Sequence, residues 1–220
     1  MGNVKLYGAS SGYVEIVPTA ASGTSTLTLP AATGTLATTA NITTAVDAVV
    51  PAGLVHINTT TFSAESSVSL DNVFTSTYDN YRLIVTLTDK SDNSGVNLRT
   101  RLAGSDDSAS VHYSSSYYIG TSGAAAGSAV GSATTSWTIF TAADSTDATG
   151  CAFLDFSDPL SAKRKLGGGT TNQRNPSGVG YGYSYYYNKT ATTAYDGLTL
   201  LSSTGTMTGT ISVYGYKNGA

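Results

Sequence analysis

The chain has 220 residues, of which 40% are hydrophobic, 10% are aromatic and 11% are charged, and its formal net charge at pH 7 is −3. Soluble domains usually carry roughly 25% charged residues, so the composition excludes a helical bundle or coiled coil, and the aromatic content with low net charge excludes a disordered chain. The 29 serines, 35 threonines and 24 glycines favour β-structure with tight turns.

Few side chains suit catalysis, metal binding or disulfide formation. The chain has two histidines, His56 and His112, and one cysteine, Cys151. We interpret the histidines as packing or interface residues and Cys151 as a small core residue. We expect a non-enzymatic protein without cofactor or metal. The pI of about 5.1 gives no general reason to bind nucleic acid.

Neither a signal peptide nor a membrane span is predicted. The first ten residues lack a basic start followed by an apolar run, and no window reaches the roughly 18 apolar residues that a membrane helix needs. We therefore expect a soluble protein that does not enter a membrane.

Residues 1–37 form the first predicted segment, which is β-rich. Short alternating runs at 4–7, 13–17 and 27–29 are separated by turns that contain glycine or proline. Strands of this length bury too little apolar area to fold alone. This segment is expected to need partners, either the rest of the chain or identical chains.

Residues 38–52 are predicted to form a short helical connector. Ile42, Val46 and Val49 follow one another at helical spacing, and Pro51 ends the run. About three turns are not stable alone. Two packings fit: the axis of a small parallel bundle, with these three residues at a trimer axis, or a linker helix packed on its own domain.

Residues 53–220 read as one all-β domain. Several short strands with no helical period between them predict an antiparallel β-sandwich or jelly roll. The strongest hairpin signal joins 81–88 to 96–102 through the turn 89–95. The low-complexity stretch 120–132 is predicted to be a surface loop, and the stretch 163–178 to be either mobile or held in place by a neighbouring segment. The remaining predicted strands are 54–57, 68–70, 137–141, 151–156, 180–187, 198–202 and 209–216.

The predicted turn at 89–95 resembles the start of a calcium-binding loop. Asp89, Ser91 and Asn93 stand at alternate positions. The glycine, Gly95, comes one position late, and Thr100 stands where the bidentate glutamate belongs. We interpret the segment as an ordinary hairpin loop.

The only basic cluster, Lys163 to Lys165 with Arg174, flanks the triplet Gly167 to Gly169. An anion site and a solvated loop both fit such a cluster. No Lys-Ser/Thr pair follows the glycines, so the phosphate-binding loop motif is absent and we favour the solvated loop.

A tyrosine ladder is the most informative feature. In the segment 180–188, strand alternation places Tyr181, Tyr183, Tyr185 and Tyr187 on one face. Tyrosine supplies a large contact area with a polar tip at low entropic cost. The ladder fits a subunit interface, the core face of a central strand, or a platform for a receptor or sugar.

Two N-terminal stretches carry a family resemblance. Residues Leu6 to Ile16 (LYGASSGYVEI) and Thr24 to Leu36 (TSTLTLPAATGTL) resemble a segment of tail-fibre and related virion proteins of tailed bacteriophages. The ending, Gly209 to Lys217, looks like the closing strand of β-sandwich domains in such proteins. The resemblance implies that the N-terminal segment attaches to another virion protein or forms a shaft, and that the β-domain is a homotrimeric head.

Three functions follow as expectations. The first is a structural virion protein, a short homotrimeric tail fibre anchored by its first segment, whose β-domain contacts a host-surface glycan or protein. The second is a capsid decoration or head-fibre protein. The third is a polysaccharide depolymerase, which needs two carboxylates beside the scissile bond; Asp155 and Asp158 are the nearest pair. We expect the virion location to be the tail rather than the capsid.

Overall fold

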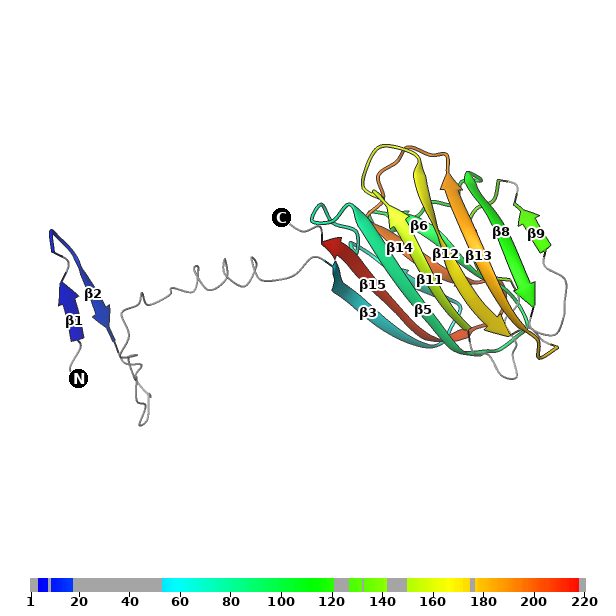
Figure 1. The fold of residues 1–220 in the computed structure, drawn as a ribbon, viewed down its shortest axis with the longest axis horizontal. Coiled ribbons are helices and arrows are strands. Elements are labelled where there is room, and N and C mark those ends of the chain that lie inside the picture. Colours follow the sequence, from blue (N-terminus) through cyan, green and yellow to red (C-terminus); the bar gives the residue numbers. More distant parts are fainter. Residues whose placement is uncertain are drawn as a thin grey trace. The chain divides into compact units, whose positions relative to one another are not determined.

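The computed structural model describes residues 4–7, 9–17, 53–120, 127–131, 133–141, 150–174 and 177–217. The chain divides into two units, Met1–Val49 and Val50–Ala220, each described here by itself (Figure 1). Every regular element of the described residues is a strand, and every strand pairing is antiparallel. The all-β prediction is confirmed. The predicted helix at 38–52, with Ile42, Val46 and Val49, lies outside the described residues.

The described part of the first unit is a hairpin of β1 (Val4–Tyr7) and β2 (Tyr13–Ile16). The side chains of Val4, Leu6 and Ile16 are 56%, 55% and 43% exposed. Since two-stranded hairpins are marginal in water, such exposure fits a segment that needs a partner.

The second unit is a sandwich of two sheets. The large sheet has eight strands in the order β3-β15-β5-β11-β12-β13-β8-β9, and the small sheet has the path β10-β6-β14-β4, with β7 paired to β6. In the large sheet the strands are β3 (Gly53–Glu65), β5 (Asn80–Lys90), β8 (His112–Gly120), β9 (Gly127–Val130), β11 (Gly150–Ser157), β12 (Lys165–Arg174), β13 (Gly180–Lys189) and β15 (Met207–Lys217). In the small sheet they are β4 (Ser67–Leu70), β6 (Val96–Leu102), β7 (Ser105–Asp106), β10 (Trp137–Phe140) and β14 (Gly197–Ser202).

The core lies between the two sheets, because each strand alternates apolar and polar side chains. β5 buries its alternate positions from Tyr81 to Leu87, and β6 buries Val96 and Leu98 from the opposite side. Trp137 of β10 is 1% exposed and packs against Phe156 and Tyr187. Among the described residues no helix has the length and apolar character needed to cross a membrane.

The predicted hairpin of 81–88 and 96–102 is wrong, although both strands exist. β5 pairs with β11 and β15 in the large sheet, while β6 pairs with β10, β14 and β7 in the small sheet. The chain therefore crosses from one sheet to the other between Lys90 and Val96. Alternation identified the buried face of each strand correctly, but it does not specify the neighbouring strand.

The solvated-loop interpretation of 163–178 is wrong, since most of this stretch is β12, a strand held in the interior of the large sheet by its neighbours. It pairs with β11 along one side and with β13 along the other. A Cβ atom on Gly169 would lie 1.9 Å from the carbonyl oxygen of Phe153, and one on Gly168 would lie 2.6 Å from that of Tyr185. The glycines that suggested a loop therefore permit a close approach of three strands.

Candidate functional site

The face of the large sheet that points away from the small sheet, here called the outer face, is the best candidate for a binding surface. Its side chains form rows across the strands. In one row Arg82, Asp155, Gly168, Tyr186 and Ser115 lie directly opposite one another on β5, β11, β12, β13 and β8. Each row therefore brings together side chains from residues that are far apart in the sequence.

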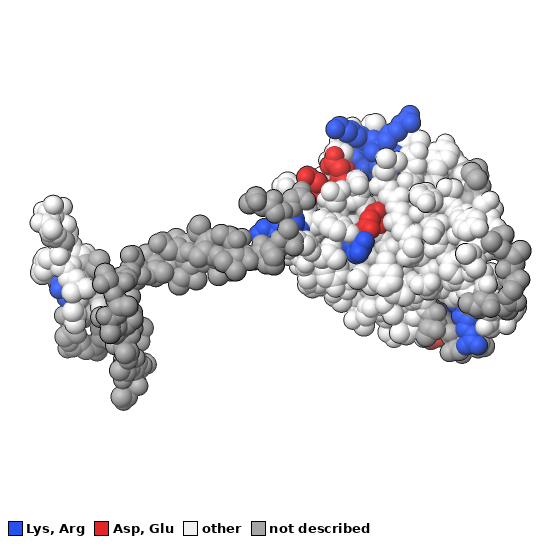
Figure 2. Space-filling view, viewed as in Figure 1, with Lys and Arg blue, Asp and Glu red and all other residues white. Residues whose placement is uncertain are grey.

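The outer face combines exposed apolar groups with little charge. Tyr186 is 67% exposed and Phe153, two residues from Asp155 on β11, is 40% exposed. Three further apolar side chains of this face, Tyr117, Ile119 and Leu166, are between 51% and 60% exposed. Figure 2 shows one touching basic and acidic pair near the middle of this face, with the other charged groups of the view toward its ends and edges. Exposed apolar groups gathered on one face indicate an interaction surface.

Three hollows lie on this side of the large sheet, and residues of β12 and β13, glycines among them, line all three. The central hollow, of about 510 Å³, is lined by Asp155, Gly168, Ser184 and Tyr186 among others. A second hollow, of about 420 Å³, shares Leu166 and Tyr186 with it and extends toward β8.

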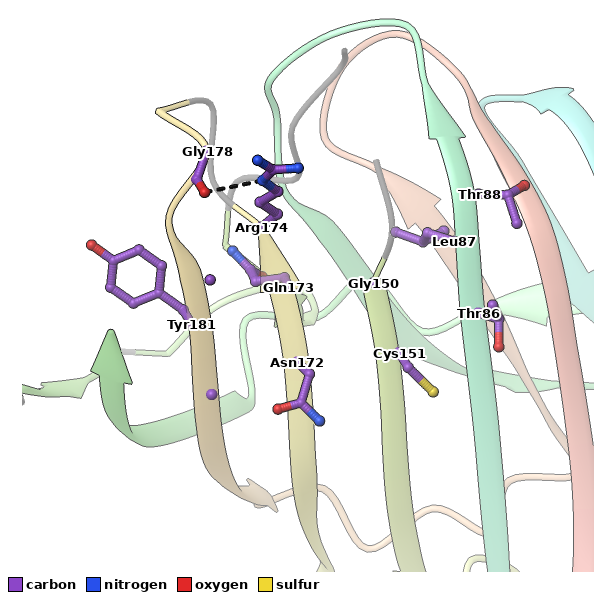
Figure 3. Close-up of a pocket in the computed structure, with 12 residues that line it drawn as sticks. Thr86, Leu87, Thr88, Gly150, Cys151, Asn172, Gln173, Arg174, Gly178 and Tyr181 are labelled. Atoms are coloured by element: carbon purple, nitrogen blue, oxygen red, sulfur yellow. Dashed lines mark hydrogen bonds between the residues drawn. The ribbon is translucent and has the colours of Figure 1, made fainter. Parts of the chain in front are cut away.

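The largest hollow, of about 610 Å³, continues along the same strands toward Arg174 (Figure 3). Its floor contains the row Thr86, Cys151, Asn172 and Gly182. At its end the Nε atom of Arg174 donates a hydrogen bond of 3.0 Å to the carbonyl oxygen of Gly178. Cys151 is half-buried on this face, so the expectation that it is a core residue is wrong.

Asp155 is held in a fixed orientation by its neighbours. Its Oδ1 accepts hydrogen bonds from Nε of Arg82 at 2.8 Å and from the hydroxyl of Tyr216 at 2.7 Å, and its Oδ2 accepts one from Arg82 at 2.6 Å. Partial burial opposes ionisation, but these bonds outweigh it and lower the pKa of Asp155. The carboxylate is therefore ionised and preorganised, with 46% of its side chain exposed.

The tyrosine ladder is real, but it faces inward. Ring centroids from Tyr181 to Tyr187 follow one another at 6.0, 5.5 and 5.7 Å. Tyr185 and Tyr187 are 3% and 2% exposed, so they belong to the core and the proposed receptor contact does not hold for them. Tyr181 and Tyr183 are half-buried and stay candidates for a contact.

The remaining residues that the sequence singled out do not form a common site. The exposed His56 contacts Thr59 and Tyr214. Lys165, 2% exposed, donates hydrogen bonds to the carbonyl oxygens of Ser161 and Lys163, so the basic cluster is divided between interior and surface. Among the described residues no group of three or more acidic, histidine or cysteine side chains is arranged to hold a metal.

A cluster of buried polar side chains surrounds Lys189, the last residue of β13. The ammonium of Lys189 lies 2.9 Å from the carboxylate of Asp107 and 2.8 Å from Nε2 of His112. Nδ1 of His112 lies 3.2 Å from two carbonyl oxygens, those of Ala109 and Thr134, so this nitrogen carries the proton and Nε2 accepts from Lys189. Both Lys189 and His112 are 0% exposed.

The neutral state of His112 predicts a loss of stability in mild acid. Burial and the charge of Lys189 lower the pKa of His112 to about 4 from an ordinary value of 6.5. The stabilisation from the neutral imidazole of His112 is complete above pH 6.5. It declines as the pH falls from 6.5 toward 4, because in this range the unfolded chain binds up to one proton more than the folded chain. The slope is at most about 1.4 kcal/mol per pH unit.

Thermal unfolding at a series of pH values between 7 and 4.5 tests this expectation. A His112→Gln variant should lose most of this slope, whereas His56→Gln, which changes an exposed histidine, should retain it. A slope unchanged in His112→Gln would assign the acid sensitivity to other groups.

Sequence reasoning missed three parts of the outer face: Tyr186, Phe153 and the gap at Gly168. The signal for Tyr186 was present, because alternation along 180–188 sets it apart from the ladder on the other face. The role of Gly168 could not be read from the sequence, since it depends on β12 lying between β11 and β13.

Comparison of the chain with protein-family models, with curated proteins and with solved structures finds no match.

Proposed function

We propose that the chain is a non-catalytic structural component of a bacteriophage virion, a short tail fibre whose β-sandwich contacts the host surface. The observation that carries the proposal is the outer face of the large sheet, which combines exposed aromatic rings, hydroxyl groups and three hollows, with the paired Arg82 and Asp155 near its middle. The resemblance of residues 6–36 to phage virion proteins supports the location and the attachment role of the first segment.

A depolymerase is the less favoured function, and Asp155 gives the reason. A glycosidase needs one carboxylic acid that stays protonated near neutral pH and a second that is ionised. Hydrogen bonds from Arg82 and Tyr216 keep Asp155 ionised. Asp158, three residues further along the chain, lies at the start of a turn with φ 47°, and it is not among the residues that hydrogen-bond to Asp155. The proposed function therefore needs no reaction step.

Trimerisation belongs to the same proposal. The stripe of Ile42, Val46 and Val49 suits a three-fold axis, and the exposed aliphatic side chains of the β1 and β2 hairpin would gain burial from identical neighbours. We therefore place the oligomer contacts in the first unit and the host contact in the second.

Two measurements on the full chain test this function. Light scattering should give three times the 22.5 kDa mass of one chain, and antibody against the sandwich should label intact particles at the tail. Label on the capsid would favour the decoration or head-fibre alternative over the tail fibre. A monomer that is absent from particles would contradict the proposal.

A further inference from the structure

The central hollow of the outer face has two chemically different walls. Asp155 on β11 and Tyr186 on β13 lie opposite Gly168, which leaves the space between them free of any side chain. Neighbouring strands are about 4.8 Å apart, so β11 and β13 are separated by about 10 Å. This width admits one flat ring between a carboxylate and a tyrosine.

The carboxylate wall is suited to hydroxyl donors. A carboxylate offers about four lone-pair sites, and three are taken by the bonds from Arg82 and Tyr216. The remaining site belongs to Oδ2, on a side chain that is 46% exposed. Because Arg82 already neutralises Asp155, an anionic ligand would gain no attraction here, whereas a neutral hydroxyl would gain a charge-assisted hydrogen bond.

The opposite wall is suited to an apolar ring face. Tyr186 is 67% exposed, and its ring makes no aromatic contact with another described side chain. Ser184 and Thr170 also line the hollow, and they add hydroxyl donors and acceptors. Flat apolar surfaces with a few placed polar groups are the usual composition of a small-molecule site.

We propose that this hollow binds a neutral saccharide chain, with one sugar ring over Gly168, its hydroxyls on Asp155 and its apolar face on Tyr186. The proposal rests on the host-contact function above and names the ligand class. The ligand is a chain because the central and the largest hollow follow one another along β12: the residues from Leu166 to Arg174 span about 26 Å at 3.3 Å per residue.

Binding of the purified full chain to immobilised polysaccharides tests the proposal. The probes are a panel of neutral polymers that includes mannan, dextran and galactan, with alginate as the acidic probe. We expect retention by a neutral polymer that changes little between about 0.05 and 0.5 M salt, because no net charge is paired.

Variants test the two walls. Tyr186→Ala and Asp155→Asn should each weaken binding about tenfold or more, whereas Tyr186→Phe should keep most of it because the ring remains. The matched control for the carboxylate is Asp71→Asn. Asp71 is also paired with an arginine, Arg101, and its side chain is 44% exposed, but it belongs to the small-sheet side of the sandwich. This control should bind like the unchanged chain.

Three outcomes would overturn the saccharide site: no retention by any neutral polymer, salt-sensitive retention by alginate alone, or self-association that Tyr186→Ala abolishes. The last would assign the face to a second copy of the chain. Particles labelled by the antibody but without saccharide binding would reject only the ligand, whereas saccharide binding by a chain absent from particles would reject only the virion role.

Discussion

Replacing Gly169 with alanine is expected to destabilise the sandwich strongly, by about 3 kcal/mol or more, because the added methyl group has no space. Its Cβ would lie 1.9 Å from the carbonyl oxygen of Phe153 and 2.8 Å from the Cα of Leu154. Both atoms belong to the backbone of β11, so relief requires β11 and β12 to separate in the interior of the large sheet. Urea unfolding of the two proteins measures the difference.

Gly182→Ala is the matched control for this prediction. Gly182 lies in the adjacent strand β13, and a Cβ there meets only the Oδ1 atom of Asn172, at the ordinary contact distance of 3.5 Å. Alanine also restricts the unfolded chain, so Gly182→Ala should leave stability unchanged or raise it by up to about 1 kcal/mol. Equal effects at Gly169 and Gly182 would contradict the close approach of β11 and β12.

Removal of Asp107 should have the second large effect, about 3 to 5 kcal/mol, because it leaves a buried ammonium without its counter-charge. Lys189 is 0% exposed, and its other contacts are the neutral His112 and the ring of Tyr195 at 4.8 Å. Burial opposes ionisation of Asp107, but hydrogen bonds from Tyr195, Ala109 and Lys189 outweigh it and lower the pKa to about 2.

Removal of the cation should be less harmful than removal of the anion. In Lys189→Met, the Asp107 side chain is 23% exposed and retains its hydrogen bonds from Tyr195 and Ala109. The double variant Asp107→Ala with Lys189→Met should recover much of the loss, since no charge then stays buried alone. Equilibrium unfolding of the three variants forms a double-mutant cycle.

A small loss for Asp107→Ala, no larger than that for Lys189→Met, would contradict this account. Asp71→Ala is the control, because Arg101 keeps its second carboxylate partner, Asp106, when Asp71 is removed. Its effect should stay below about 1 kcal/mol.

Local alternation predicted which face of each strand is buried, and the structure confirms this where the pattern is clear. Tyr81, Leu83, Val85 and Leu87 share the core face of β5, as their spacing indicates. The same rule placed Tyr185 and Tyr187 together on one face of β13 but left open whether that face was core or surface. Burial depends on what packs against a face, and in this case Trp137 and Phe156 come from other strands.

The candidate site was predicted on the right strand and on the wrong face. The ladder drew attention to Tyr181 through Tyr187, whereas the exposed ring beside a hollow is Tyr186. Asp155 was predicted only as one of a pair of catalytic carboxylates, because its sequence neighbours do not show that Arg82 and Tyr216 hold it. Those partners are 73 and 61 residues away along the chain.

The sequence by itself determined the all-β class, the division near Pro51 and the buried face of the clearer strands, because these depend on composition and on residues two positions apart. Only the tertiary structure decided the neighbours of each strand. β5 and β6 lie in different sheets, and the glycine triplet, whose composition suggests a loop, lies in an interior strand of the large sheet. The physical reason is that strand pairing depends on contacts between distant segments. β12 needs its glycines because backbone atoms of β11 and β13 lie where a Cβ atom would be. The same lack of side chains opens the hollow over Gly168.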